Sequence, residues 1–182
     1  IEKFIRRIIG EDILCQTHLA KESLVIHADS HQMDQVLMNF ATNARDAMPG
    51  GGVFSITTER IRIDQDFIDL HGFGIPGPYA RITVADTGKG MNPQTVAKIF
   101  DPFFTTKEMG KGTGLGLAVV YGIIKQHQGH IEVTSTPGKC TVLTVYLPLL
   151  AADPHDHRDT IGLEQPRGGR ETILLAEDEP TV

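Results

Sequence analysis

Amide and carboxylate side chains recur on one stripe of a long helical pattern in the first third of the chain. Asn39 and Asn43 are four residues apart, and Asp46 follows one turn later, so all three lie close together on a helix. A solvent-facing polar stripe is the alternative, but asparagine is a poor residue inside a helix. An amide carbonyl is a hard oxygen ligand that suits Mg²⁺. The stripe therefore marks a candidate Mg²⁺ site.

A second motif follows an apolar, strand-like run. Asp86 ends that run, and Gly88 and Gly90 come directly after it. A carboxylate at a strand end can accept a hydrogen bond from an exocyclic amine, and neighbouring glycines let a flat ring approach the backbone. Asp and Gly are also ordinary residues of a turn between a strand and a helix. This motif alone leaves both interpretations open.

A third motif places four glycines at every second position, from Gly110 to Gly116, immediately before a helical pattern. Such glycines weaken a helix or a strand, but they suit a backbone that passes close to a ligand. The N-terminal amides of the following helix favour phosphate. The motif differs from a Walker A loop, because Lys-Ser or Lys-Thr is missing, and from the dinucleotide fingerprint in its spacing.

The elements that must position these motifs alternate between helix and strand. Hydrophobic periodicity and caps predict helices at 1–9, from Asp29 or Ser30 to Met48, from Asn92-Pro93 to Phe100, and at 114–128. Strands are predicted near 12–19, 24–28, 53–60, 80–86, 130–135 and 140–147, and residues 64–78 are predicted to be irregular. The alternation predicts an α/β sandwich with one mixed sheet and helices on one face.

Composition excludes several classes of protein. The 182 residues carry a net charge of −6, of which residues 1–150 contribute only −1, so no basic field exists to attract nucleic acid. No apolar run reaches the length of a membrane span, and no signal peptide is recognisable. Cys15 and Cys140 are the two cysteines. With so few cysteines we expect no disulfide framework, and we expect the protein in the reducing cytosol.

Taken together, the three motifs resemble the N, G1 and G2 boxes of the ATP-binding domain of sensor histidine kinases. The segment Phe100–Lys107 is similar to the F box of that family, and the resemblance extends from about Glu11 to Pro148. It implies a two-layer α/β sandwich of the Bergerat type. The sheet would be mixed and mostly antiparallel, with helices on one face and a flexible ATP lid at 101–113.

The resemblance also implies roles for particular residues. Asn43 would be the Mg²⁺ ligand, Asn39 would lie beside the phosphates, and Asp86 would bind the adenine amino group in a pocket shaped by Gly88 and Gly90. The remaining candidate contacts to the nucleotide are Asp46, Phe103, Phe104, Lys107, Lys111, Gly112, Thr113, Gly114, Leu115 and Gly116.

The type of residue at position 39 bears on the reaction. Relatives that hydrolyse ATP, such as gyrase and the heat-shock chaperone, carry Glu where this chain has Asn39, and a neutral amide cannot act as a general base. The resemblance thus implies transfer of the γ-phosphoryl to a protein histidine, with Asn39 and Lys107 as catalytic positions. A slow ATPase of the same fold and a non-catalytic nucleotide-binding or docking module are the alternatives.

The ends of the chain suggest a longer parent protein. The sequence begins without Met inside a helical pattern, and we expect the phosphoacceptor histidine to lie on a preceding dimerisation helix. Residues 1–150 would form the catalytic domain, 151–171 a linker, and 172–182 the truncated first strand of a receiver domain, with Glu177-Asp178 as its acidic pair. Expected partners are the dimerisation helices and a receiver domain or response regulator, in the cytoplasm and without direct membrane contact.

Overall fold

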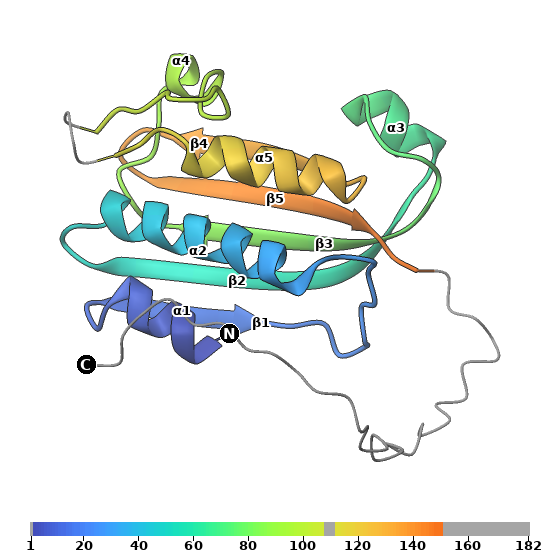
Figure 1. Cartoon of the computed structure of the whole chain (residues 1–182), viewed down its shortest axis with the longest axis horizontal. Helices are drawn as coiled ribbons and strands as arrows, with labels where there is room; N and C mark the ends of the chain where they lie inside the picture. The colour runs from blue at the N-terminus through green and yellow to red at the C-terminus, as the bar shows by residue number, and fades with distance from the viewer. Residues whose placement is uncertain (1, 108–111, 151–182) are drawn as a thin grey trace, which may run out of the picture. The chain divides into compact units, whose positions relative to one another are not determined.

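A computed structural model describes residues 2–107 and 112–150 (Figure 1). The helices are α1 (Glu2–Ile9), α2 (Ser30–Ala47), α3 (Gln65–His71), α4 (Pro93–Val96) and α5 (Gly116–Gln126). The strands are β1 (Ile13–His18), β2 (Gly52–Ile63), β3 (Gly77–Asp86), β4 (His130–Thr136) and β5 (Cys140–Pro148).

The five strands form one mixed sheet in the order β1-β2-β3-β5-β4. β1 runs parallel to β2, and the other three neighbouring pairs are antiparallel. This confirms the predicted mixed, mostly antiparallel sheet. β3 is the central strand, and its last residue, Asp86, pairs with Phe54 of β2 on one side and with Thr141 of β5 on the other.

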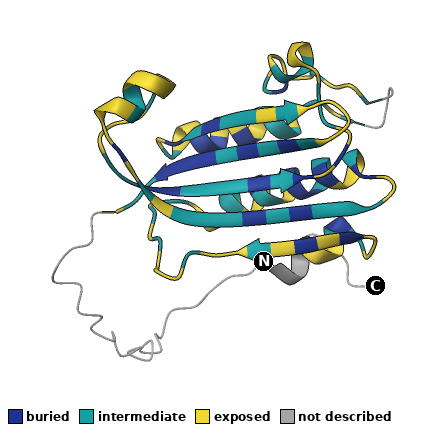
Figure 2. Ribbon diagram, turned by 180° about the vertical axis from the view of Figure 1, so that it is seen from behind, coloured by how far each residue is buried: buried dark blue, intermediate teal, exposed yellow. Residues whose placement is uncertain are grey.

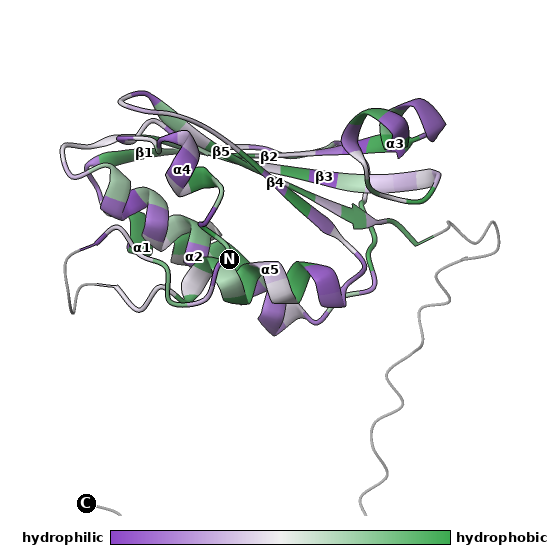
Figure 3. Ribbon diagram, turned by 90° about the horizontal axis from the view of Figure 1, so that it is seen from above, coloured by the Kyte–Doolittle hydropathy of each residue, from purple (hydrophilic) through white to green (hydrophobic). Residues whose placement is uncertain are grey.

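One face of the sheet is covered by α1, α2 and α5, as Figure 3 shows. The main hydrophobic core lies between these helices and the sheet, and Phe40, Phe54, Ile124 and Val145 in it are at most 2% exposed. Side chains alternate between the two faces of a strand, and the residues that β2 and β5 contribute to this core are accordingly two apart: Phe54 and Ile56 from β2, and Leu143, Val145 and Leu147 from β5.

The opposite face of the sheet, seen in Figure 2, carries a smaller apolar cluster at one end. α3 packs there through Phe67, whose ring meets that of Tyr146 at 5.7 Å between centroids. His71 Nδ1 lies 3.0 Å from Glu132 Oε1, and the Tyr146 hydroxyl donates to Glu132 Oε2 at 3.0 Å. Burial and the adjacent carboxylate raise the pKa of Tyr146 to about 12.

Two local predictions are wrong. Residues 64–78 contain α3, which begins after the Asp64 cap and ends at Gly72, a residue with φ of 74°. The glycine and proline content of the segment masked this short helix. The strand predicted at 24–28 is reduced to one bridge between Ile26 and Leu149, because the backbone there meets the sheet at a single point.

Most other boundaries are close to expectation, but α4 ends at Val96 instead of the predicted Phe100, and residues 97–100 form turns. Asp29 caps α2 by accepting from the backbone N–H groups of His31 and Gln32, at 2.8 and 3.2 Å. Asn92 caps α4 through Thr95 N at 2.8 Å. The predicted linker at 151–171, the receiver strand at 172–182 and part of the predicted lid, 108–111, lie outside the described residues. None of the helices within the described ranges combines the length and apolar character needed to cross a bilayer.

Truncation of the fully buried Phe54 tests the main core. Phe54→Ala should lower the free energy of unfolding by about 3–5 kcal/mol, because a large side chain is replaced by a cavity. Urea denaturation followed by circular dichroism measures this. Leu14→Ala, on β1 and 57% exposed, is the control and should change stability by less than about 0.5 kcal/mol. Equal effects of the two substitutions would contradict the assignment of the core.

Candidate nucleotide-binding site

A cavity of about 780 Å³ opens between the C-terminal half of α2, the ends of β3 and β5, and the segment that follows α4. The lining residues from β3, β5 and the segment 91–99 are mostly apolar, and we call this part of the lining the apolar end. Asn43, Arg45, Asp46 and residues 105–107 are polar or charged, and we call this part the polar end. Its lining comprises Phe40, Asn43, Ala44, Arg45, Asp46, Ala47, Pro49, Val84, Asp86, Lys89, Gly90, Met91, Thr95, Ile99, Phe104, Thr105, Thr106, Lys107, Leu117, Thr141 and Leu143.

Asp86 lies at the apolar end and is 9% exposed. Its Oδ1 accepts from the backbone N–H of Gly88 at 2.9 Å. Burial raises the pKa of the Asp86 carboxyl above its ordinary value, although hydrogen bonds from the backbone of Gly88 and Thr141 act in the opposite direction. A buried carboxylate with accepting capacity left over is suited to bind an N–H donor on a flat ligand.

Thr141 is a cavity residue that sequence reasoning missed. It lies opposite Asp86 in the pairing of β3 with β5, it is 7% exposed, and its hydroxyl is 3.1 Å from that of Ser135. Ile99 and Leu143, each buried, also line this end. Thr141 and Leu143 are distant from Asp86 in sequence and come to the cavity through the pairing of β3 with β5, whereas Ile99 comes from the segment after α4.

Gly88 and Gly90 are required by close backbone contacts. A Cβ on Gly88 would lie 2.7 Å from the Ala47 carbonyl oxygen. Gly90 has φ of 61°, and a Cβ there would lie 2.0 Å from the Thr136 carbonyl oxygen. Any side chain at either position would displace the loop after Asp86 from α2 or from the β4–β5 turn. The two glycines therefore fix the loop that borders the cavity.

The two asparagines of α2 have different surroundings. Asn43 lines the cavity, whereas Asn39, one turn earlier, is not among the lining residues. The Asn39 side-chain Nδ2 donates to the Gln35 carbonyl at 3.0 Å, and its Oδ1 would lie 2.8 Å from a Cβ on Gly116. Asn39 thus stands at the contact between α2 and the first residue of α5.

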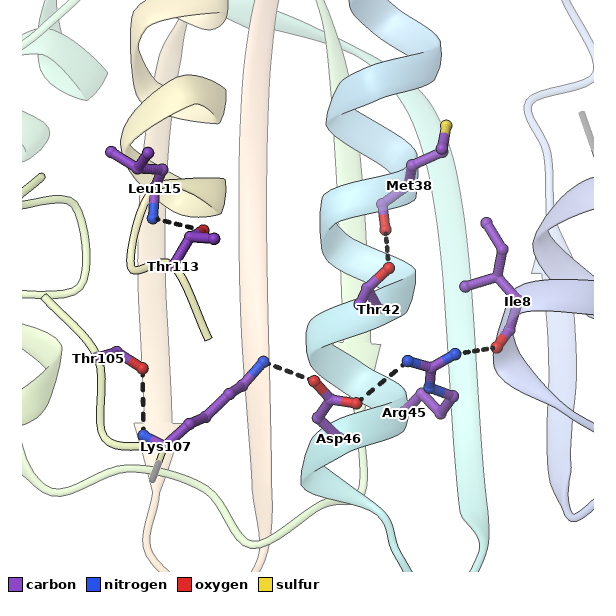
Figure 4. A network of polar contacts seen from close by, with 9 residues as sticks. All are labelled: Ile8, Met38, Thr42, Arg45, Asp46, Thr105, Lys107, Thr113 and Leu115. Atoms are coloured by element: carbon purple, nitrogen blue, oxygen red, sulfur yellow. Dashed lines mark hydrogen bonds and ion pairs between the residues drawn. The ribbon is translucent and has the colours of Figure 1, made fainter. Parts of the chain in front are cut away.

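The polar end of the cavity contains a chain of charged contacts, drawn in Figure 4. Lys107 Nζ lies 2.5 Å from Asp46 Oδ2, and Arg45 Nη2 lies 3.4 Å from Asp46 Oδ1. Arg45 Nη1 also donates to the Ile8 carbonyl at 3.3 Å. Burial opposes ionisation of Asp46, but Lys107 and Arg45 prevail and leave the pKa of this carboxyl below its ordinary value.

The start of α5 is shaped by its glycines and lines the cavity through Leu117, whereas Gly114, Leu115 and Gly116 lie outside the lining. Gly114 has φ of 65°, and a Cβ there would lie 2.4 Å from the Phe103 carbonyl carbon. Phe103 itself has φ of 68° and is 74% exposed. Leu115 N donates to Thr113 Oγ1 at 3.3 Å.

Six predicted site residues therefore meet around one cavity. These are Asn43, Asp46, Asp86, Gly90, Phe104 and Lys107. The predicted residues outside the lining are Asn39, Gly88, Phe103, Gly112, Thr113, Gly114, Leu115 and Gly116, while Lys111 falls outside the described residues.

The polar end offers few donor groups for Mg²⁺, but their chemistry suits this ion. Within residues 2–107 and 112–150, no three His, Cys, Asp or Glu side chains are grouped so that they could hold a metal ion. Asn43 and Asp46 nevertheless offer an amide oxygen and a carboxylate at neighbouring turns of α2. Mg²⁺ often binds through one or two protein oxygens and completes its shell with waters and substrate phosphates.

Comparison with known proteins places this architecture in a family. Residues 28–151 match the family described as histidine kinase-, DNA gyrase B-, and HSP90-like ATPase. The chain is 39% identical to sensor kinase CckA of Brucella abortus, over 100% of this chain and 20% of that protein. It is 38% identical to sporulation kinase A of Bacillus subtilis, over 75% of this chain and 20% of the relative. The chain thus spans about a fifth of the length of these curated relatives.

Solved structures agree with the sequence comparison. The catalytic domain of histidine kinase ThkA, in a nucleotide-free form, matches with a TM-score of 0.60 and 30% identity, over 81% of this chain and 84% of that one. Full-length ShkA in complex with AMPPNP matches with a TM-score of 0.65 and 27% identity, over 82% of this chain and 28% of that one. The chain therefore belongs to the family of histidine kinase-, DNA gyrase B- and HSP90-like ATPases, as an ATP-binding domain of the sensor histidine kinase type.

Proposed function

We propose that this domain binds Mg-ATP and transfers the γ-phosphoryl to a histidine on the dimerisation helices of its parent protein. The observation that carries the proposal is the polarity of the cavity. A buried carboxylate, Asp86, lies at the apolar end, and Asn43, Asp46 and Lys107 lie at the other end. An adenine ring and a polyphosphate need such a division of one cavity into apolar and charged ends.

At the apolar end, the Asp86 carboxylate would accept a hydrogen bond from the adenine amino group. The half-buried Met91 and the buried Ile99 and Leu143 would contact the ring. Gly88 and Gly90 keep the loop close to α2 and to the β4–β5 turn, so that the ring can approach the backbone.

At the polar end, the Asn43 amide oxygen would hold Mg²⁺, and the ion would neutralise phosphate charge. Asn39 and Lys107 would orient the phosphates. The backbone amides at Gly112, Gly114 and Gly116, together with Lys111, Thr113 and Leu115, would complete the phosphate contacts. Phe103 and Phe104 would belong to the lid over the nucleotide.

Asn39 favours phosphoryl transfer over hydrolysis. Its amide is neutral and its Nδ2 is already engaged with the Gln35 carbonyl at 3.0 Å, so it offers no base for a water molecule. Catalysis would rest on positioning and on charge neutralisation, as is usual for phosphoryl transfer. The acceptor histidine would come from the preceding helices, and a receiver domain or response regulator would take the phosphoryl group next, in the cytoplasm.

Nucleotide binding provides the first test. Calorimetric titration with Mg²⁺ and a non-hydrolysable ATP analogue should show one site. Asp86→Asn should weaken it at least tenfold, or by about 1.4 kcal/mol or more, because the amine loses its charged acceptor. Asp34→Asn, exposed on α2 outside the cavity, is the charge-matched control and should bind normally. No binding by a folded wild type would favour the docking-module alternative.

The same Asp86→Asn variant should raise the thermal stability of the nucleotide-free domain at pH 7. The pKa of Asp86 is raised in the folded chain, so burying the ionised carboxylate costs stability above that pKa. As the pH falls through the folded pKa and then the unfolded pKa, this cost vanishes. The difference in melting temperature between variant and wild type should therefore shrink in acid. A less stable variant at pH 7 would contradict the argument.

Phosphate release separates kinase from ATPase. Because Asn39 supplies no general base, the wild-type domain with Mg-ATP should release phosphate no faster than Asn43→Ala, in which the metal ligand is gone. A coupled phosphate assay measures both rates. Release by the wild type that clearly exceeds release by Asn43→Ala would instead support the slow-ATPase alternative.

A further inference from the structure

The ammonium group of Lys107 is engaged by a carboxylate that also lines the cavity. Its Nζ lies 2.5 Å from Asp46 Oδ2, across the polar end of the cavity (Figure 4). The backbone of Lys107 is held as well, because its N–H donates to Thr105 Oγ1 at 3.1 Å. Lys107 therefore has a partner both at its backbone and at its ammonium group.

Asp46 is itself anchored from its other side. Arg45 Nη2 contacts Asp46 Oδ1 at 3.4 Å, and Arg45 Nη1 donates to the carbonyl of Ile8, near the end of α1. The carboxylate consequently has one oxygen toward Arg45 and the other toward Lys107. The two cations lie on either side of this carboxylate and pair with it.

The location of this pair matters for phosphate binding. Asp46 follows Asn43 by three residues on α2, and both line the cavity with Lys107. Phosphates that reached Asn43 would therefore meet the negative charge of Asp46 and a lysine whose ammonium is already paired.

We propose that Asp46 is a positioning residue that holds the ammonium of Lys107 through this ion pair, and that nucleotide phosphates must displace the Asp46 carboxylate to engage this lysine. The inference rests on the proposed function. For a metal-free polyphosphate it gives Asp46 an effect opposite to that of a phosphate ligand: its carboxylate lowers the affinity.

The expected change in ATP affinity depends on how exposed the Lys107–Asp46 pair is. The side chains of Lys107 and Asp46 are 31% and 32% exposed, so solvent weakens their attraction, and pairs of this kind contribute modestly. Removing the carboxylate should free the ammonium and also remove a like charge from the path of the phosphates. We expect a gain in affinity of about two- to fivefold.

The experiment compares ATP in the presence of EDTA with adenosine, by calorimetry, on the folded chain. Four proteins form a cycle: wild type, Asp46→Asn, Lys107→Gln and the double variant. Asp46→Asn should bind ATP two- to fivefold more tightly and adenosine equally well. In the Lys107→Gln background, the gain from Asp46→Asn should fall to less than half, because no lysine is left to release. Asp34→Asn again serves as the control for net charge.

Two results would overturn the inference. Weaker ATP binding by Asp46→Asn would mean that the carboxylate supports the ligand or places Lys107 favourably for it. An equal gain with and without Lys107 would reduce the effect to charge repulsion alone. Failure of the proposed function has a different signature, since the wild type would then bind neither adenosine nor Mg-ATP.

Discussion

The site depends on the burial of one carboxylate at the end of the central strand. Asp86 is nearly inaccessible, and it is tolerated there because backbone N–H groups of Gly88 and Thr141 reach it. One of these donors comes from the adjacent turn and the other from β5, the strand paired with β3. Because two elements far apart in sequence share this carboxylate, the register of the sheet and the shape of the cavity are coupled.

Helix α2 also contributes both to the core and to the cavity that contains Asp86. α2 buries Phe40 and Ala44 against the sheet and presents Asn43 and Asp46 to the cavity from the neighbouring stripe. The packing of the apolar stripe of α2 against the sheet therefore determines that its polar stripe faces the cavity. Gly88 adds a close approach, since its backbone lies against the Ala47 carbonyl. One face of α2 thus stabilises the fold by packing, and the adjacent face places polar side chains at the cavity.

Sequence reasoning recovered the parts of the site that lie within continuous segments. The asparagine stripe, Asp86 and the alternating glycines are local patterns. Asn43, Asp86 and Lys107 do share a cavity, whereas Asn39 and the glycines at 112, 114 and 116 lie outside its lining. Thr141 escaped because its role depends on antiparallel pairing with a residue 55 positions away. Arg45 escaped because its contact with the Ile8 carbonyl depends on how α1 meets α2. Such long-range contacts follow from register and helix packing, which no local pattern encodes.

Charge is arranged locally, because residues 1–150 carry a net charge of only −1 and exert little long-range attraction on an anion. The cations at the polar end therefore matter individually. Two of them, Lys107 and Arg45, contact one carboxylate, and Arg45 also reaches the backbone of α1. One guanidinium thus contacts both the backbone of α1 and the carboxylate that pairs with Lys107. The first helix of the domain and the polar end of its cavity are in this way physically connected.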